Sequence, residues 1–120
     1  MSESEKYTTL RDFWPFYLRE HAEPVNRALH YAGSTLVLIV LACAILFQNP
    51  WLALLMPITG YGFAWFGHFF VEKNRPATFT YPVYSLISDW IMYGYWLVGR
   101  LNGELEKAGV PARQRATAGF

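Results

Sequence analysis

Hydrophobic and polar residues alternate in blocks along the chain, and the first block has the period of an α-helix. In residues 10–22, large hydrophobic side chains recur every three or four positions, and the charged residues lie largely opposite them. This pattern is typical of an amphipathic helix that lies in the membrane interface. Pro15 kinks or restarts the helix, and Glu23-Pro24 ends it. The predicted apolar face consists of Leu10, Phe13, Trp14, Tyr17, Leu18 and His21.

Two longer apolar segments follow, at residues 29–47 and 51–71. Each matches the length of about 20 residues that a helix needs to cross a hydrocarbon core of about 30 Å. The turn between them carries no charge, so we expect helices over about residues 26–48 and 51–73 that form an antiparallel hairpin. Pro57 and three glycines interrupt the second segment, which is tolerated where neighbouring helices pack closely.

A third apolar segment, predicted as a helix over about residues 83–103, carries Asp89 in its first half. It is long enough to cross, and the alternative is a re-entrant or interfacial helix. The predicted fold is an all-α polytopic membrane protein. It has an antiparallel transmembrane hairpin, a third membrane-embedded helix and an N-terminal interfacial helix. We expect one membrane-embedded domain over residues 10–103, between a flexible N-terminus (1–9) and a flexible C-terminal tail (104–120).

Composition and charge support a membrane protein. Hydrophobic residues make up 53% of the chain, and charged residues make up 16%, against roughly 25% in soluble domains. No Lys, Arg, Asp or Glu occurs from Ala28 to Val71. A net charge of +1 without a basic stripe gives no indication of nucleic-acid binding. The single cysteine, Cys43, excludes an intramolecular disulfide and a multi-cysteine metal site.

The positive residues favour one orientation in the membrane. Six lie before the first span or between the second and third segments, the hairpin turn has none, and four lie in the tail. The positive-inside rule therefore places the side that carries the six residues in the cytoplasm. Three full crossings would put the four positive residues of the tail on the opposite side, and a third segment that does not fully cross would remove this conflict. The two groups are Lys6, Arg11, Arg19, Arg27, Lys73 and Arg75, and Arg100, Lys107, Arg113 and Arg115.

All three histidines are predicted to lie at the cytoplasmic end of the hairpin. His30 begins the first span, His68 ends the second, and His21 immediately precedes the first. Because the hairpin is antiparallel, these positions meet on one side. Three i, i+4 pairs aim further polar groups along the helix faces there: Asn26–His30, His68–Glu72 and Ser85–Asp89.

Ionisable residues at a membrane edge are costly and favour a functional interpretation. Taken singly, His21 and His30 also fit headgroup-level residues, and His68 also fits a hydrogen bond between helices. Asp89 also fits an ion pair with Arg75 or Arg27. None of these alternatives explains why all three histidines converge. We therefore predict a metal site with His21, His30 and His68 as ligands and Asn26, Glu72 and Asp89 as catalytic or supporting groups; the sequence leaves open whether Glu72 or Asp89 contacts the metal, and iron and zinc both fit these ligands.

Two stretches carry a family resemblance: FYLREHAEPVNRALHYAGS (16–34) and GYGFAWFGHFFVEKNRPATFTYPVYSLISD (60–89). Their motifs are H-x2-P-x-N-R-x2-H and G-H-x3-E-x-N-x-P-A-T-F. Over about residues 13–103 the chain resembles a family of small polytopic membrane proteins. That family includes a fungal endoplasmic-reticulum Fe(II)-dependent 2-hydroxy fatty acid dioxygenase of phytosphingosine metabolism. The resemblance implies that His21, His30 and His68 are iron ligands.

The resemblance also implies a reaction, the oxidative decarboxylation of a long-chain 2-hydroxy fatty acid by O₂. The acid is shortened by one carbon, as in fatty acid α-oxidation, and no nucleotide cofactor is needed. Arg27, Arg75 and Tyr81 are the candidates to bind the substrate. The acyl tail would stay among membrane lipids while the polar head reaches the metal.

Two other functions remain open from the sequence. One is a zinc-dependent membrane lipid hydrolase that uses the same ligands. The other is a non-catalytic membrane interaction or transport protein, but residues 36–47 offer no polar side chain beyond Cys43 to continue a path. The sequence leaves the oligomeric state open and is compatible with a homo-oligomer.

Overall fold

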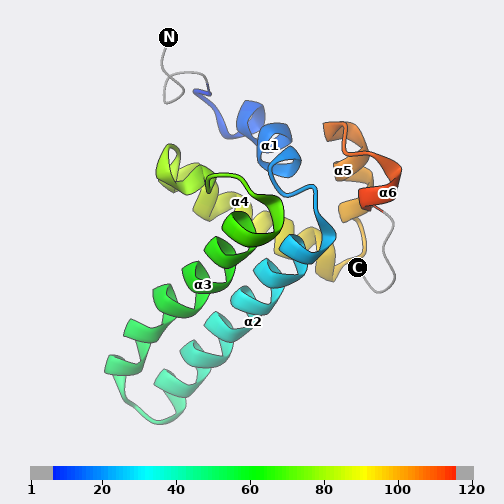
Figure 1. The fold of residues 1–120 in the computed structure, drawn as a ribbon. Helices are drawn as coiled ribbons and strands as arrows, with labels where there is room; N and C mark the ends of the chain where they lie inside the picture. Colours follow the sequence, from blue (N-terminus) through cyan, green and yellow to red (C-terminus); the bar gives the residue numbers. More distant parts are fainter. Residues whose placement is uncertain (1–6, 116–120) are drawn as a thin grey trace.

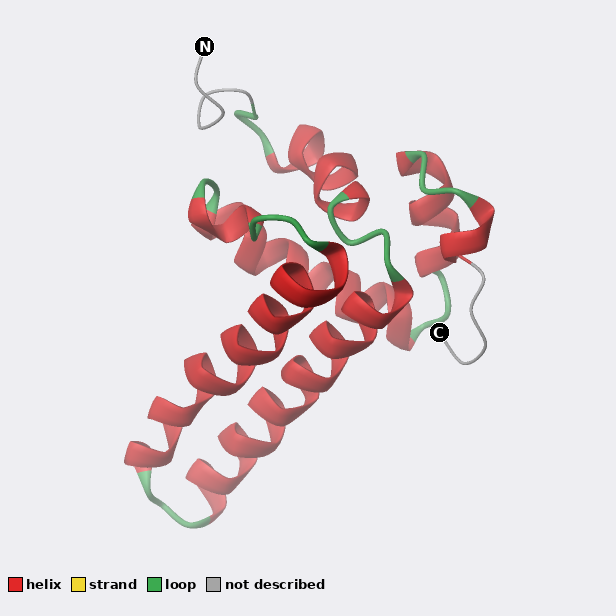
Figure 2. Cartoon of the chain, in the orientation of Figure 1, coloured by secondary structure: helices red, strands yellow, loops and turns green. Residues whose placement is uncertain are grey.

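The computed structural model describes residues 7–115, and it contains helices and no strand within that range. Two long helical stretches project from one end of the molecule, and the shorter helices gather at the other end (Figures 1 and 2). In chain order the elements are α1 (Leu10–Arg19), α2 (Pro24–Leu46), η2 (Pro50–Leu54), α3 (Leu55–Phe66), η3 (Gly67–Glu72), η4 (Ala77–Phe79), α4 (Pro82–Leu97), α5 (Leu101–Ala108) and α6 (Ala112–Arg115).

The predicted pair of long apolar helices is confirmed. α2 and α3 run antiparallel and side by side, joined at the far end by a tight turn and the 3₁₀ helix η2 (Figure 1). Pro57 falls in the first turn of α3, where a missing N–H costs no helical hydrogen bond. The helices approach closely at Gly33, where an added Cβ would lie 3.1 Å from the Cβ of Phe63. Small residues at the contact therefore permit the approach, as in membrane helix pairs.

Two stretches of 23 residues, Pro24–Leu46 and Pro50–Glu72, are long and apolar enough to cross a membrane. α4 is shorter than the third predicted helix, at 16 residues, and it ends at Leu97. Gly99 then adopts a φ of +74°, which glycine tolerates without strain, and the chain turns into α5. Only the first two stretches meet the length of a span among residues 7–115.

The hydrophobic core lies at the end of the molecule where α1, α4 and α5 meet. The helix predicted over residues 10–22 ends at Arg19, and Phe13, Tyr17 and Leu18 on its apolar face are almost completely buried. They pack on other helices of the protein, whereas the sequence pattern predicted contact with the lipid interface. A helix that covers a protein core has the same amphipathic pattern as one on a membrane, so the pattern could not separate the two.

Residues 104–115, predicted to begin a flexible tail, are mostly helical in the structure. Leu101, Leu105 and Ala108 recur at i, i+4 and i+7 and bury the inner face of α5, and Val110 is buried just after it. The Trp14 indole N–H donates to the Glu104 carboxylate at 2.9 Å and links α1 to α5. Of the two predicted flexible ends, residues 1–6 and 116–120 lie outside the described part of the chain. Tyr7 packs edge-on against Phe13.

η3 continues α3 as a π-helical turn, in place of the α-helical turn predicted for His68 and Glu72. Such turns are rare and often occur at functional sites. Gly67 begins this turn, and an added Cβ there would lie 1.9 Å from Oδ1 of Asn26 and 3.0 Å from its Cγ. Because Asn26 is fully buried, its side chain has little room to move away. The contact fixes the distance between α2 and η3, the two elements that carry His30 and His68.

We therefore expect Gly67→Ala to destabilise the protein by about 1–3 kcal/mol, the usual cost of overpacking. Gly62→Ala is the matched control, because nothing lies within 4 Å of a Cβ added there. The control should keep or slightly raise stability, since alanine is the better helix former. Thermal unfolding of the purified proteins in one detergent measures both. Equal unfolding temperatures for the two variants would contradict the assigned contact.

Candidate metal centre

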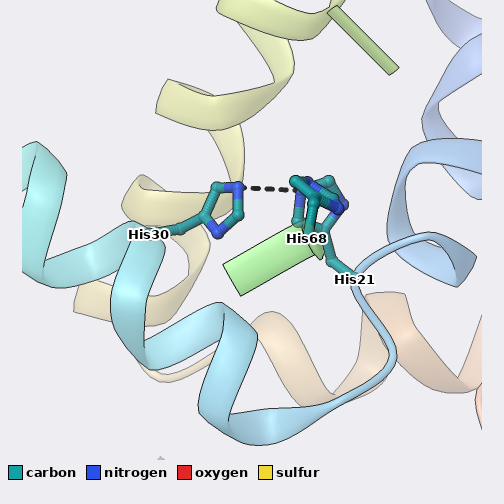
Figure 3. Close-up of side chains that lie close together, drawn as sticks. All are labelled: His21, His30 and His68. Atoms are coloured by element: carbon teal, nitrogen blue, oxygen red, sulfur yellow. Dashed lines mark hydrogen bonds between the residues drawn. The ribbon is translucent and has the colours of Figure 1, made fainter. Parts of the chain in front are cut away.

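The three histidines meet in one buried cluster at the base of the hairpin (Figure 3). Nε2 of His21 lies 3.1 Å from Nε2 of His30 and 3.0 Å from Nε2 of His68. The three rings are nearly perpendicular to one another, and each residue is at most 6% exposed. No carboxylate among the described residues joins the group.

The other nitrogen of each ring faces an oxygen that can only accept a hydrogen bond. Nδ1 of His21 lies 2.7 Å from the Tyr17 carbonyl, and Nδ1 of His30 lies 2.9 Å from the Asn26 carbonyl. Nδ1 of His68 lies 2.7 Å from Oδ1 of Asn74. The amide of Asn74 is oriented by its own Nδ2, which donates to the Glu20 carbonyl at 3.0 Å. All three rings therefore carry their proton on Nδ1, and their Nε2 lone pairs are free.

Three Nε2 lone pairs face one another, with Nε2 of His21 about 3 Å from each of the other two, and they repel unless a proton or a cation lies between them. A proton is disfavoured, because burial, and then the neighbouring His30 and His68, hold the pKa of His21 well below its usual range. A metal ion satisfies all three atoms. Two nitrogens about 2.1 Å from one ion are about 3.0 Å apart when they subtend a right angle, which agrees with the separations of 3.1 Å and 3.0 Å from His21 to His30 and His68. The cluster fits a metal ion held on one face by three neutral imidazoles.

The local chain path explains why His21 points inward although it lies outside a helix. Arg27 is fully buried, and its guanidinium donates to the carbonyls of His21 at 2.9 Å and Ala22 at 2.7 Å. It also donates to the Gln114 carbonyl at 2.6 Å, and Gln114 donates to the Glu23 carboxylate at 2.6 Å. The turn between α1 and α2 is therefore held by Arg27 of α2 and by Gln114 of the C-terminal helix α6.

The predicted supporting residues lie beside the cluster, with separate contacts. The Glu72 carboxylate accepts from the Glu23 backbone N–H at 2.6 Å and from Nδ2 of Asn26 at 3.3 Å, and so it caps the start of α2. Asp89 accepts a hydrogen bond from the Tyr17 hydroxyl. It makes no ion pair with Arg27 or Arg75, the partners considered from the sequence.

The predicted substrate-binding residues do not line the cavities at the cluster. Arg27 makes the backbone contacts described above. Arg75 is exposed and lies over the ring of Phe79, 5.4 Å from its centroid. Tyr81 is buried in the aromatic core with Phe13 and Tyr84. Contact of these three residues with a substrate stays a prediction.

Two residues of the site were not assigned a role from the sequence, Asn74 and Tyr17. Asn74 stands in the quoted G-H-x3-E-x-N motif, and its spacing of six residues from His68 is not a helical one. Only the left-handed turn at Lys73, with a φ of +59°, brings the Asn74 side chain back to the ring. Tyr17 stacks on His21 with ring centroids 4.0 Å apart. Burial and the neighbouring Asp89 raise the pKa of Tyr17 well above its usual range, so its hydroxyl keeps its proton and donates to Asp89.

Two cavities adjoin the cluster. A small one of about 20 Å³ touches all three histidines, Tyr17 and Asp89, and this is room for about one water molecule. A larger one of about 310 Å³ lies between α2, α3 and α4. His30, Tyr61, Ala64 and Asp89 border both cavities. The site therefore has a small polar end at the histidines and a larger, mostly apolar space next to it.

Comparison with known proteins identifies the family. The family model described as 2-hydroxy-palmitic acid dioxygenase Mpo1-like matches residues 7–101, a range that contains the three histidines, Asn74 and Asp89. No curated protein and no solved structure matches the chain. Because the match covers most of the chain and the whole histidine cluster, the protein belongs to the Mpo1-like family.

Proposed function

We propose that this protein is a membrane-bound, Fe(II)-dependent dioxygenase that oxidatively decarboxylates long-chain 2-hydroxy fatty acids. The observation that carries the proposal is the triad itself, three buried Nε2 lone pairs that only a cation or a proton can satisfy. Family membership supplies the reaction class, since the family description names a dioxygenase of 2-hydroxypalmitic acid.

The reaction class excludes zinc, and the resemblance noted from the sequence favours iron among the redox-active metals. Imidazole ligands suit zinc, copper, iron and nickel alike, but zinc has no redox chemistry. A ferrous ion held by His21, His30 and His68 would supply the electron transfer to O₂ and positions for the hydroxyl and carboxylate of the substrate. The net reaction is R-CH(OH)-COOH + O₂ → R-COOH + CO₂ + H₂O, in which the acid itself provides the electrons.

The residues around the small cavity suit the polar end of such a substrate. Asp89 borders this cavity, and its carboxylate has a second oxygen besides the one that accepts from Tyr17. It can accept the hydrogen bond of the substrate's 2-hydroxyl group and hold the proton that this group releases. The hydroxyl of Tyr17 donates to the Asp89 carboxylate and keeps it in place, and the ring of Tyr17 stacks on His21.

We further propose that α2 and α3 cross the membrane and that the site lies at its cytoplasmic edge. The far half of the hairpin exposes many large apolar side chains, among them Leu46 (77% exposed), Phe47 (71%) and Trp51 (75%). Soluble proteins rarely expose a contiguous apolar surface of this kind. The excess of Lys and Arg at the histidine end supports the cytoplasmic orientation.

We expect purified protein to contain equimolar iron and to release CO₂ from 2-hydroxypalmitate under air but not under argon. His68→Gln should lose the iron and reduce turnover to the rate without protein, because one of three ligands is gone. Lys107→Gln, at an exposed position of α5, is the control and should behave as the wild type. Elemental analysis and CO₂ release measure the two effects. Equimolar zinc with O₂-independent product release would instead support a hydrolase.

Asn74 provides a second test, because it orients the His68 ring without touching the ion. Asn74→Ala should weaken iron binding by about 10–100-fold, as is usual when the partner of a ligating histidine is removed. Asn74→Asp keeps an acceptor for Nδ1 and should recover most of the affinity. Both variants lose the bond to the Glu20 carbonyl, so the difference between them reports the bond to the ring. Competition with a chelator measures the affinity, and equal values for the two variants would rule out this role.

A further inference from the structure

The larger cavity begins at His30 and Asp89 and continues along the hairpin. On α2 it is lined by His30, Ser34 and Val37, which lie on one face at helical spacing and lead away from the site. On α3 it is lined by Ala64, Gly60 and Met56, which follow the same course in the opposite chain direction. Leu86 and Trp90 of α4 close the third side. The cavity is therefore an apolar passage with its polar end at the metal site.

Gly60 lets α2 and α3 close one wall of this passage. An added Cβ there would lie 3.2 Å from Cγ2 of Val37, closer than an ordinary van der Waals contact. The lack of a side chain at Gly60 therefore allows Val37 to pack directly against α3.

The length of the passage can be compared with that of an acyl chain. From His30 to Val37, α2 advances about 10 Å at about 1.5 Å per residue. An extended chain advances about 1.3 Å per bond, as the 3.8 Å spanned by three bonds of polypeptide shows. The passage therefore accommodates about eight bonds beyond the carbon that meets the histidines, and a chain of sixteen carbons would extend beyond it.

We propose that this passage holds the first part of the substrate's acyl chain and that Ser34 and Val37 mark its depth. The inference rests on the proposed function and adds where the substrate tail lies. One end of the passage meets the polar site, and the rest is apolar, as in a fatty acid with a single polar end. Leu86 is 49% exposed and Trp90 is 37% exposed on the wall formed by α4, so the remainder of a long chain passes outward among membrane lipids.

This arrangement predicts a particular dependence on chain length. Each buried methylene group contributes about fourfold in affinity, so catalytic efficiency should rise steeply up to about ten carbons. It should then level off, because longer acids enter the site from the membrane and no longer from water, and their further carbons stay in a lipid environment.

The test uses aromatic substitutions at three positions of α2. Ser34→Phe, about one turn from His30, should lower kcat/KM for 2-hydroxyoctanoate and 2-hydroxypalmitate at least about tenfold and spare 2-hydroxyhexanoate. Val37→Phe, about one turn further on, should lower kcat/KM only for 2-hydroxypalmitate. Leu38→Phe is the matched control, because Leu38 is 45% exposed and does not line the passage. This variant should leave kcat/KM unchanged for all three acids. Circular dichroism and gel filtration confirm that each variant is folded.

A second readout does not depend on turnover. A 2-hydroxypalmitate that carries a photoreactive diazirine on its tenth carbon is cross-linked to the protein in nanodiscs, before and after iron removal. The label should fall near Gly60 on α3, which faces Val37, and should be lost in Val37→Phe.

The outcomes separate the two proposals. The passage is overturned if the wild type and Val37→Phe turn over acids with the same chain-length profile, or if the label falls only on outward-facing residues. Either result leaves the proposed dioxygenase activity unaffected. Label near Gly60 without any O₂-dependent turnover overturns the dioxygenase and leaves a fatty-acid passage.

Discussion

Three neutral imidazole rings held with their lone pairs facing one another are the constraint on which the rest of the structure depends. Such a cluster is unfavourable by itself, because each Nε2 has lost its hydrogen bonds to water and gained only the repulsion of the other two. The protein maintains it by fixing the opposite side of every ring: two Nδ1 atoms donate to backbone carbonyls and the third donates to Asn74. A bound cation would make this arrangement favourable, which is why we propose that the cluster binds metal.

Much of the surrounding structure holds the three histidine rings in their relative positions. Arg27 holds the turn that carries His21, and the contact between Gly67 and Asn26 sets the distance between the other two. Asn74 joins the His68 ring to the end of α1, and Glu72 caps the start of α2. Residues from five parts of the chain, including the C-terminal helix α6, therefore act on one site.

The two ends of the molecule have different physical tasks. The histidine end has a packed protein core and a dense hydrogen-bond network, and it can exclude water from an ion. The far end of the hairpin buries little within the protein and exposes apolar side chains to its surroundings. A site at the junction of these two environments suits a substrate with one polar end and one apolar end. Asp89 lies at this junction, since it borders both cavities and is held by Tyr17.

The sequence by itself determined the two long apolar helices, their antiparallel pairing and the meeting of the three histidines at one end. These features follow from hydrophobic length and from the geometry of a short turn, which are local properties. Tertiary structure decided that the apolar face of α1 covers a protein core and that α4 stops short of a span. It also decided that the tail folds back as α5 and α6, because α5 packs on α1. The orientation of the His68 ring, which Asn74 fixes, depends on a π-helical turn and a left-handed residue. Such backbone departures arise from contacts between distant segments, so no local pattern of residues could reveal them.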